Sequence, residues 1–302
     1  MKINNILWAT DGSEEANYAL KYAKYFAELN RASIIGLHVI PMPVELLFES
    51  MRDLGEEYEN WRLNVEKDIS SMFAKVQKEL AKSGIKFEGV ILKGSPNGKI
   101  REYTKKSKAD LVIVGKHGHG FIDNMVAGSE TLKVLKKSIV PVLAVKGTNK
   151  KRKINIKNIL VPIDFTEYNE SALVYALDLA QLIGADIRVI YALSLNMYAQ
   201  NIPSGALEIV INNSEEHLKK QVQDIKKKYG KPSRIKDINI ETEVIHGLNP
   251  SLSITNYARS NKSDLIIIHT HGKTGVKKFL LGSVTEKVVN WSECSVLALN
   301  PK

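Results

Sequence analysis

The sequence predicts an α/β protein made of two copies of one domain, and two observations carry that prediction. Short apolar runs alternate along the chain with amphipathic segments, which is typical of strand-helix units around a parallel sheet. The chain also repeats itself, because NILWATDGS returns as NILVPIDFT and Asp11 thereby aligns with Asp164. Later in each copy, Gly128 aligns with Gly282. A length of 302 residues suits two such domains.

Five strands are expected in the first copy, with helices between them. The expected strands span Asn5–Thr10, Ser33–Ile40, Lys86–Lys93, Leu111–Gly115 and Val140–Lys146. The fourth strand is apolar at consecutive positions in both copies, LVIV and LIII, which predicts a central strand covered on both faces.

Two helices of the first copy are predicted by apolar residues at helical spacing. After the first strand, Ser13 is a candidate N-cap for a helix. Its apolar stripe is Ala16, Ala19, Leu20, Ala23, Phe26 and Ala27, repeated in the second copy by Ala172, Leu173, Ala176, Leu179 and Ala180. The segment from Asp53 to Lys82 carries a stripe that we expect to face the core. Its members are Leu54, Tyr58, Trp61, Val65, Ile69, Met72, Phe73, Val76 and Leu80.

Composition and charge narrow the class of protein. The excess of ten basic residues is divided equally between the two sides of Lys150, and this balance argues against a dedicated nucleic-acid-binding domain. The basic stretch from Lys219 to Lys236 contains only one aromatic residue, so we interpret it as a solvated helix face. A single cysteine, Cys294, and a start that leads directly into a strand favour the cytoplasm. No apolar run approaches the length of a membrane span, and no membrane partner is expected.

The domain boundaries follow from the repeat. We expect a first domain over residues 1–147, a linker over 148–155 and a second domain over 156–302. The connecting sequence, KGTNKKRKIN, is polar and basic, as exposed linkers usually are.

A glycine pattern follows the predicted central strand of the first copy. Gly115, Gly118, Gly128 and Ser129 form G-x2-G-x9-G-S. Ligands of open α/β sheets bind at the carboxyl ends of strands, and glycines followed by a helix start allow close approach of a phosphate. No P-loop motif occurs, and no dinucleotide fingerprint follows the first strand. Glycines after a strand often only form turns, but here the same arrangement recurs with Asp11 and Asp164 at the same sheet edge.

These residues resemble the universal stress protein (UspA) superfamily, and specifically its tandem two-domain members. The resemblance covers nearly the whole chain. It implies two Rossmann-like, adenine-nucleotide α-hydrolase-like domains, each with a five-stranded parallel sheet in the order 3-2-1-4-5. It also implies that Ala9, Asp11 and Val39 hold adenine and ribose. By the same resemblance the phosphates lie on the glycine loop, at Gly115, His117, Gly118, His119, Gly128, Ser129, Glu130 and Thr131.

The second copy matches the family pattern less fully. The corresponding positions are Pro162, Asp164, Ala192, Gly272, Gly282, Ser283, Val284 and Thr285. His269 replaces the first glycine of the pattern, and a side chain there could crowd the phosphates. Our hypothesis is therefore that ATP, or ADP or AMP, binds in the first copy, and that the second binds weakly or not at all.

The sequence assigns neither a dedicated metal site nor a catalytic residue. His117 with His119, and His269 with His271, form H-x-H pairs that lack a third ligand, so no dedicated metal site is expected. Mg²⁺ is instead expected to arrive with the nucleotide phosphates. The loop carries no recognised base motif, so any ATP hydrolysis should be slow and no catalytic residue is assigned.

The resulting prediction is a cytoplasmic, ATP-binding, stress-response signalling module. The resemblance implies pairing of the two domains through their last strands, Val142–Val145 and Val296–Leu299, and further pairing into a homodimer is a separate expectation. The alternatives are a nucleotide-free scaffold or chaperone-like protein, and an enzyme that handles adenylate. The missing S-G-G-x-D-S type of loop counts against the enzyme.

Overall fold

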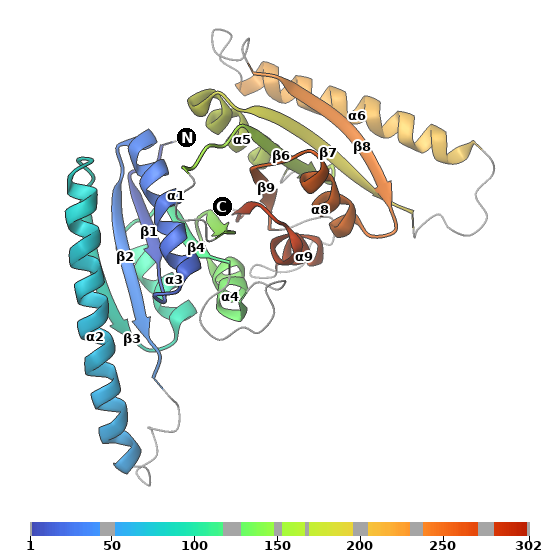
Figure 1. The fold of residues 1–302 in the computed structure, drawn as a ribbon. Helices are drawn as coiled ribbons and strands as arrows, with labels where there is room; N and C mark the ends of the chain where they lie inside the picture. The colour runs from blue at the N-terminus through green and yellow to red at the C-terminus, as the bar shows by residue number, and fades with distance from the viewer. Residues whose placement is uncertain are drawn as a thin grey trace. The chain divides into compact units, whose positions relative to one another are not determined.

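A computed structural model describes residues 2–42, 52–116, 128–147, 153–166, 169–195, 205–229, 238–270 and 281–300. The chain divides into two compact units, an N-terminal unit within residues 2–147 and a C-terminal unit within residues 153–300. Each unit has the predicted α/β class, with helices packed around a parallel sheet (Figure 1). Much of the predicted linker lies outside the described residues.

The N-terminal unit contains a five-stranded parallel sheet in the order β3-β2-β1-β4-β5. Its elements are β1 (Asn5–Ala9), α1 (Glu14–Asn30), β2 (Ser33–Ile40), α2 (Arg52–Ala81), β3 (Phe87–Lys93), α3 (Pro96–Lys106), β4 (Leu111–Gly115), α4 (Ser129–Lys137) and β5 (Val142–Val145). All strands of the sheet are parallel, so their carboxyl ends meet at one edge. The segments that follow β1, β2 and β4 are thereby brought together at this edge.

The C-terminal unit repeats this architecture in the order β8-β7-β6-β9-β10. Its elements are β6 (Asn158–Ile163), α5 (Asn169–Ile183), β7 (Asp186–Ser194), α6 (Ala206–Tyr229), β8 (Ile240–Gly247), α8 (Pro250–Ser260), β9 (Leu265–His269), α9 (Ser283–Trp291) and β10 (Ser295–Leu299). No helix of the described segments is both long enough and apolar enough to cross a membrane.

Local chemistry explains where the first strand and helix meet. Ser13 is the N-cap of α1, as predicted, and its side-chain oxygen accepts a hydrogen bond from the Ala16 N–H at 3.2 Å. The predicted stripe of α1 is buried except for Leu20, which is only partly covered; Tyr18 and Tyr22 join it instead. Strands β4 and β9 are buried along their whole length, as expected for inner strands.

The last strand of the N-terminal unit is shorter than predicted. Residues 140–146 were expected to be extended, but β5 spans Val142–Val145. Pro141 has no N–H and contributes only its carbonyl, which accepts from Val112, so regular pairing starts after it.

The long helix α2 packs on the sheet where two neighbouring strands carry glycines and so leave space for an aromatic side chain. We call this space the notch. Gly36 of β2 and Gly89 of β3 are register partners, and Phe73 of α2 fills the space that their missing side chains leave. A Cβ atom on Gly89 would lie 2.5 Å from the Phe73 ring. Phe73 also meets Trp8 and Phe87 edge-on, with ring centroids 6.2 and 5.7 Å away.

The predicted core-facing stripe of this helix is wrong at Trp61, while Tyr58 and Val65 are half-buried and the side chain of Leu54 lies outside the described part of the chain. Ile69, Phe73, Val76 and Leu80 are buried, whereas Trp61 remains 45% exposed. A helix of 30 residues is about 45 Å long, and a seven-residue strand is about 23 Å long. The first turns of α2 therefore extend past the sheet, beside which Figure 1 shows the helix lying.

Candidate functional site at the carboxyl edge of each sheet

The end of β1 is held in a fixed turn that presents Asp11. Ala9 is buried, and the chain turns directly after it because the Asp11 carboxylate accepts the Ser13 N–H at 3.0 Å. The Gly12 N–H bonds the Thr10 hydroxyl at 3.1 Å. Such Asx turns are stable local structures, so Asp11 is positioned before any ligand binds.

The end of β2 is tied to this turn by a buried histidine. The His38 Nδ1–H donates to the Thr10 carbonyl at 2.9 Å. Burial lowers the pKa of His38 below its usual value, and this effect outweighs the opposing influence of that hydrogen bond and of the Asp11 carboxylate. Val39, the next residue, is buried at the same edge. Neutral His38 therefore connects two of the predicted nucleotide-contacting segments.

A second set of hydrogen bonds joins the end of β4 to the start of α4. The buried Thr131 hydroxyl donates to the Gly115 carbonyl at 2.9 Å. The Gly128 N–H donates to the Lys116 carbonyl at 2.8 Å. These bonds hold together the two ends of the predicted glycine loop, although the loop itself lies outside the described residues. His117, Gly118 and His119 fall in that part of the chain.

The first turn of α4 offers backbone donors at this edge. Gly128 is the N-cap and has no side chain with which to cap the helix, and the first N–H bonded to Gly128 is that of Leu132, at 3.2 Å. The N–H groups of Ser129, Glu130 and Thr131 therefore form no hydrogen bond within the helix. Such a helix start attracts anions.

The side chain of Glu130 belongs to a hydrogen-bonded chain of its own. Lys133 donates to the Glu130 carboxylate at 2.6 Å, and the Asn97 side-chain amide donates to it at 3.2 Å. Lys137 in turn donates to the Asn97 side-chain oxygen, Oδ1, at 2.7 Å. Burial raises the pKa of Glu130, but the hydrogen bonds from Lys133 and Asn97 outweigh it and hold that pKa below its usual value. The carboxylate is thus kept charged and balanced by a lysine.

The C-terminal unit builds the same frame. The Thr285 hydroxyl donates to the His269 carbonyl at 2.8 Å, and the Gly282 N–H donates to the Thr270 carbonyl at 2.7 Å. Gly282 is the N-cap of α9, whose first turn is formed by Ser283, Val284 and Thr285. Asp164 forms the same Asx turn, accepting from the Thr166 N–H at 3.1 Å. Gly272 lies outside the described residues.

The two units differ first in how their central strands pair. Strands β1 and β4 pair over four positions, up to Ala9 with Val114. Strands β6 and β9 pair over two, Ile159 with Leu265 and Leu160 with Ile266. Pro162 stands where β1 has Ala9, and a proline cannot donate to a ladder. The ladder between β6 and β9 consequently ends before the carboxyl edge of the sheet.

A second difference between the units is the residue that follows the aspartate at the end of the first strand. Gly12 follows Asp11 with φ +85°, but Phe165 follows Asp164 with φ +62°, a left-handed conformation that bulky residues rarely adopt. The Phe165 ring stacks on the His217 ring, with ring centroids 4.7 Å apart and ring planes inclined by 3°. Its centroid also lies 4.4 Å from that of the Tyr191 ring. Near Ala192, the predicted adenine position of this unit, an aromatic cluster therefore adjoins the sheet edge.

A third difference concerns the first glycine of the pattern. A Cβ atom at Gly115 would lie 2.9 Å from the Ala16 backbone nitrogen, so this glycine permits α1 to begin close to the end of β4. His269 occupies the aligned position, and its side chain is buried. The N-terminal unit thus combines Gly115, a ladder of four pairs between β1 and β4, and a glycine directly after Asp11.

The structure gives two predicted residues a role that was not expected, and it adds Asn97, which sequence reasoning missed. The hydroxyls of Thr131 and Thr285 join strand to helix, whereas Thr131 was expected to contact phosphate. Its presence at the aligned place in both copies was a signal. Asn97 gave no signal, because its role depends on the packing of α3 against α4.

The comparisons with known proteins agree with this architecture. The family model described as "Universal stress protein family" matches residues 2–146 and again residues 155–300. The chain belongs to the universal stress protein family. The two matches, one per unit, also establish the tandem arrangement.

Relatives of this universal stress protein occur as single domains and as tandem chains. Universal stress protein MJ0577 of Methanocaldococcus jannaschii is 33% identical over 154 residues, covering 48% of this chain and 95% of its own. A universal stress protein of Mycolicibacterium smegmatis is 24% identical over 298 residues, covering 98% of this chain and 97% of its own. A universal stress protein structure from Archaeoglobus fulgidus covers 99% of both chains with TM-score 0.69 at 20% identity, which is a likeness of fold.

Proposed function

We propose that the N-terminal unit of this universal stress protein binds ATP, with Mg²⁺, at the carboxyl ends of β1, β2 and β4. The observation that carries the proposal is the convergence of two pre-formed elements on one sheet edge. One is the Asx turn that holds Asp11, and the other is the first turn of α4, whose first three N–H groups form no hydrogen bond within the helix.

Each element supplies chemistry that suits a different part of the nucleotide. A carboxylate such as Asp11 accepts hydrogen bonds from ribose hydroxyls, and a glycine loop with a helix start accommodates phosphates. Phosphate oxygens are ligands that Mg²⁺ prefers, and the cation would offset the negative charge of Asp11 beside a polyphosphate. Because Glu130 is already bound by Lys133 and Asn97, its charge is partly balanced.

We further propose that the C-terminal unit binds nucleotide weakly or not at all. Three departures support this asymmetry: Pro162 shortens the central ladder, Phe165 adds an aromatic cluster, and His269 adds a side chain where the other unit has glycine. The protein then acts as a nucleotide-dependent binding module in the cytoplasm, with at most slow hydrolysis. Pairing of the last strands and homodimer formation stay predictions.

The test is a titration with Mg·ATP of the wild type and of a matched pair, Asp11→Ala and Asp164→Ala. Both variants lose the same kind of turn, and Asp164→Ala also loses the bond from the Thr166 hydroxyl at 2.6 Å, so its folding penalty should be at least as large. Only Asp11→Ala should lower ATP affinity, by about tenfold or more. ATP at about 100 times its Kd should stabilise the wild type by about 2.7 kcal/mol. Absence of any stabilisation would favour the nucleotide-free scaffold, and rapid release of AMP and pyrophosphate would favour an adenylate-handling enzyme.

A further inference from the structure

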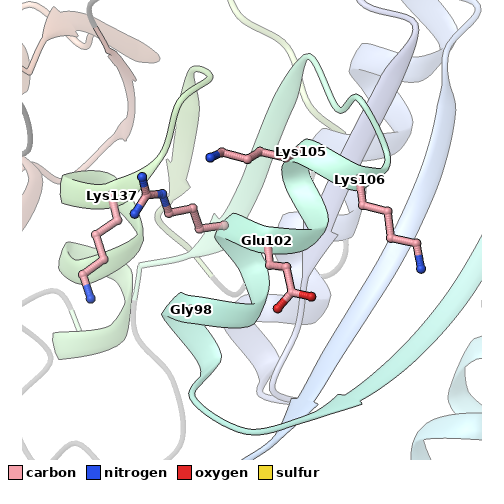
Figure 2. Close-up of a pocket in the computed structure, with 6 residues that line it drawn as sticks. Gly98, Glu102, Lys105, Lys106 and Lys137 are labelled. Atoms are coloured by element: carbon pink, nitrogen blue, oxygen red, sulfur yellow. The ribbon is translucent and has the colours of Figure 1, made fainter.

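A basic groove runs between α3 and α4 of the N-terminal unit. Its volume is about 660 Å³, and it is lined by Gly98, Arg101, Glu102, Lys105, Lys106 and Lys137. Five of these residues lie on α3 and one on the last turn of α4 (Figure 2). Both helices begin at the carboxyl edge of the sheet and end at the amino edge. Arg101, Lys105 and Lys106, on the later turns of α3, therefore lie away from the proposed ATP site, whereas the Lys137 ammonium reaches back to Asn97 in the first turn of α3.

The charge of this groove is strongly one-sided. Four of its six residues are cations, and its acid, Glu102, is bound by Lys99 at 2.8 Å. That hydrogen bond holds the pKa of Glu102 below its usual value, so the carboxylate is charged but committed to a lysine outside the lining. Lys106 lies over the Tyr103 ring at 5.6 Å, and Figure 2 shows it pointing away from α4.

The remaining cations, Arg101, Lys105 and Lys137, define the part of the groove that faces α4. Figure 2 shows Lys105 directed toward the end of α4 that carries Lys137. Arg101 is half-buried, and the Lys137 ammonium is held by the Asn97 side chain at 2.7 Å. Gly98, at the start of the groove, adds no side chain that would fill it; a Cβ there would meet nothing closer than Ser95 at 3.7 Å.

The C-terminal unit shows that the fold does not need these charges. Gly98, Arg101, Glu102, Lys105, Lys106 and Lys137 align with Leu252, Thr255, Asn256, Arg259, Ser260 and Trp291. Three of the four cations are replaced, and the retained Arg259 pairs with Glu293 at 3.4 Å. Lysines at helix ends offset the helix dipole, but α9 has no basic residue in its last turn, and Arg101 lies in the middle of α3.

We propose that this groove binds a small anion that carries two or more phosphate groups. Arg101 offers a planar fork suited to one phosphate, and Lys105 and Lys137 add point charges on two different helices. A ligand must carry several negative charges to engage both helices. The α3 residues of the lining run from Gly98 to Lys106, about 12 Å of helix, which suits a short polyphosphate compound.

The experiment uses inorganic tripolyphosphate as the probe and the full chain as the protein. Lysine acetylation, followed by mass spectrometry, locates the bound anion because a covered ammonium reacts more slowly. Lys105 and Lys137 should be protected, whereas Lys78, an exposed lysine of α2, should react unchanged. Protection confined to other lysines, or equal protection of Lys78, would overturn the proposal.

Two variants make the assignment quantitative. Arg101→Thr introduces the residue that the C-terminal unit has at this position, and Lys137→Met keeps the length of the side chain without its charge. Each should weaken tripolyphosphate binding about tenfold by calorimetry when it is combined with Gly118→Val, which blocks the proposed phosphate site on the glycine loop. Lys78→Gln combined with Gly118→Val is the matched control and should bind as Gly118→Val alone does. Unchanged affinity in both groove variants would contradict the proposal, whether or not ATP binds at the other edge of the sheet.

Discussion

The Thr131 hydroxyl donates a hydrogen bond to the Gly115 carbonyl at 2.9 Å, and this contact fixes the start of α4 to the end of β4. Both residues are buried. Because Thr285 and His269 form the same bond at 2.8 Å, the joint is a property of the repeated domain. What differs between the units is the residue that provides the carbonyl, and so the space beside it.

Thr131→Val should destabilise the protein while keeping the shape of the side chain. The substitution leaves the buried Gly115 carbonyl without its donor, and we expect a loss of about 1–2 kcal/mol in the free energy of unfolding. Urea unfolding measures this. Thr131→Ser keeps the hydroxyl and should lose less. If Thr131→Val also lowers ATP affinity and Thr285→Val does not, the joint in the N-terminal unit supports the nucleotide site; equal effects of the two valine variants would contradict this.

The sequence predicted the elements well where the controlling interactions are local. The Ser13 cap bonds a residue three positions away, and the inner strand β4 shows its burial as an unbroken apolar run. Prediction failed where distant segments decide. Trp61 has the spacing of a core residue, but its turn of α2 lies beyond the sheet. The effect of Pro162 needed the pairing of β6 with β9, and Phe165 has a left-handed backbone that no local pattern indicates.

Gly89→Ala should disturb the packing of α2 on the sheet. The new Cβ would lie 2.5 Å from the Phe73 ring, which is itself confined by Trp8 and Phe87, so the ring must move. Overpacking of this kind costs about 1–3 kcal/mol. Gly55→Ala is the control: it lies in α2 with open space around it and should stabilise by about 0.5–1 kcal/mol. Thermal unfolding of both variants provides the comparison. A Gly89→Ala variant as stable as the wild type would contradict the packing of Phe73 against Gly89.

Two substitutions at Phe165 separate the cost of its left-handed backbone from the contribution of its ring packing. Phe165→Ala and Phe165→Gly both remove the ring from the cluster with Tyr191 and His217, but only glycine adopts φ +62° without penalty. Phe165→Gly should therefore be more stable than Phe165→Ala by about 1 kcal/mol. The same difference should appear at Gly12, where a Cβ would meet only Ile69 at 3.8 Å. An alanine variant as stable as the glycine one would contradict the assigned conformation.

His38 should make the protein less stable in acid. Burial lowers the pKa of His38 in the folded state, so the unfolded chain binds more protons below the usual histidine pKa of about 6.5. Stability contributed by neutral His38 is present above that pH and is lost as pH falls through it. His38→Gln, whose amide can still donate to the Thr10 carbonyl, should show a smaller loss between about pH 7.5 and pH 5.5. Denaturant unfolding at both pH values decides, and equal losses in the two proteins would refute the assignment.

Nucleotide carried by the purified protein tests the central claim most directly. The protein is denatured, and released nucleotide is identified and counted by mass spectrometry for the wild type, Gly118→Val and Gly272→Val. The account predicts about one adenine nucleotide per chain, retained in Gly272→Val and lost in Gly118→Val, because only the N-terminal unit has the glycine pattern without departure. Nucleotide that survives Gly118→Val but disappears in Gly272→Val would place the working site in the C-terminal unit and contradict the account.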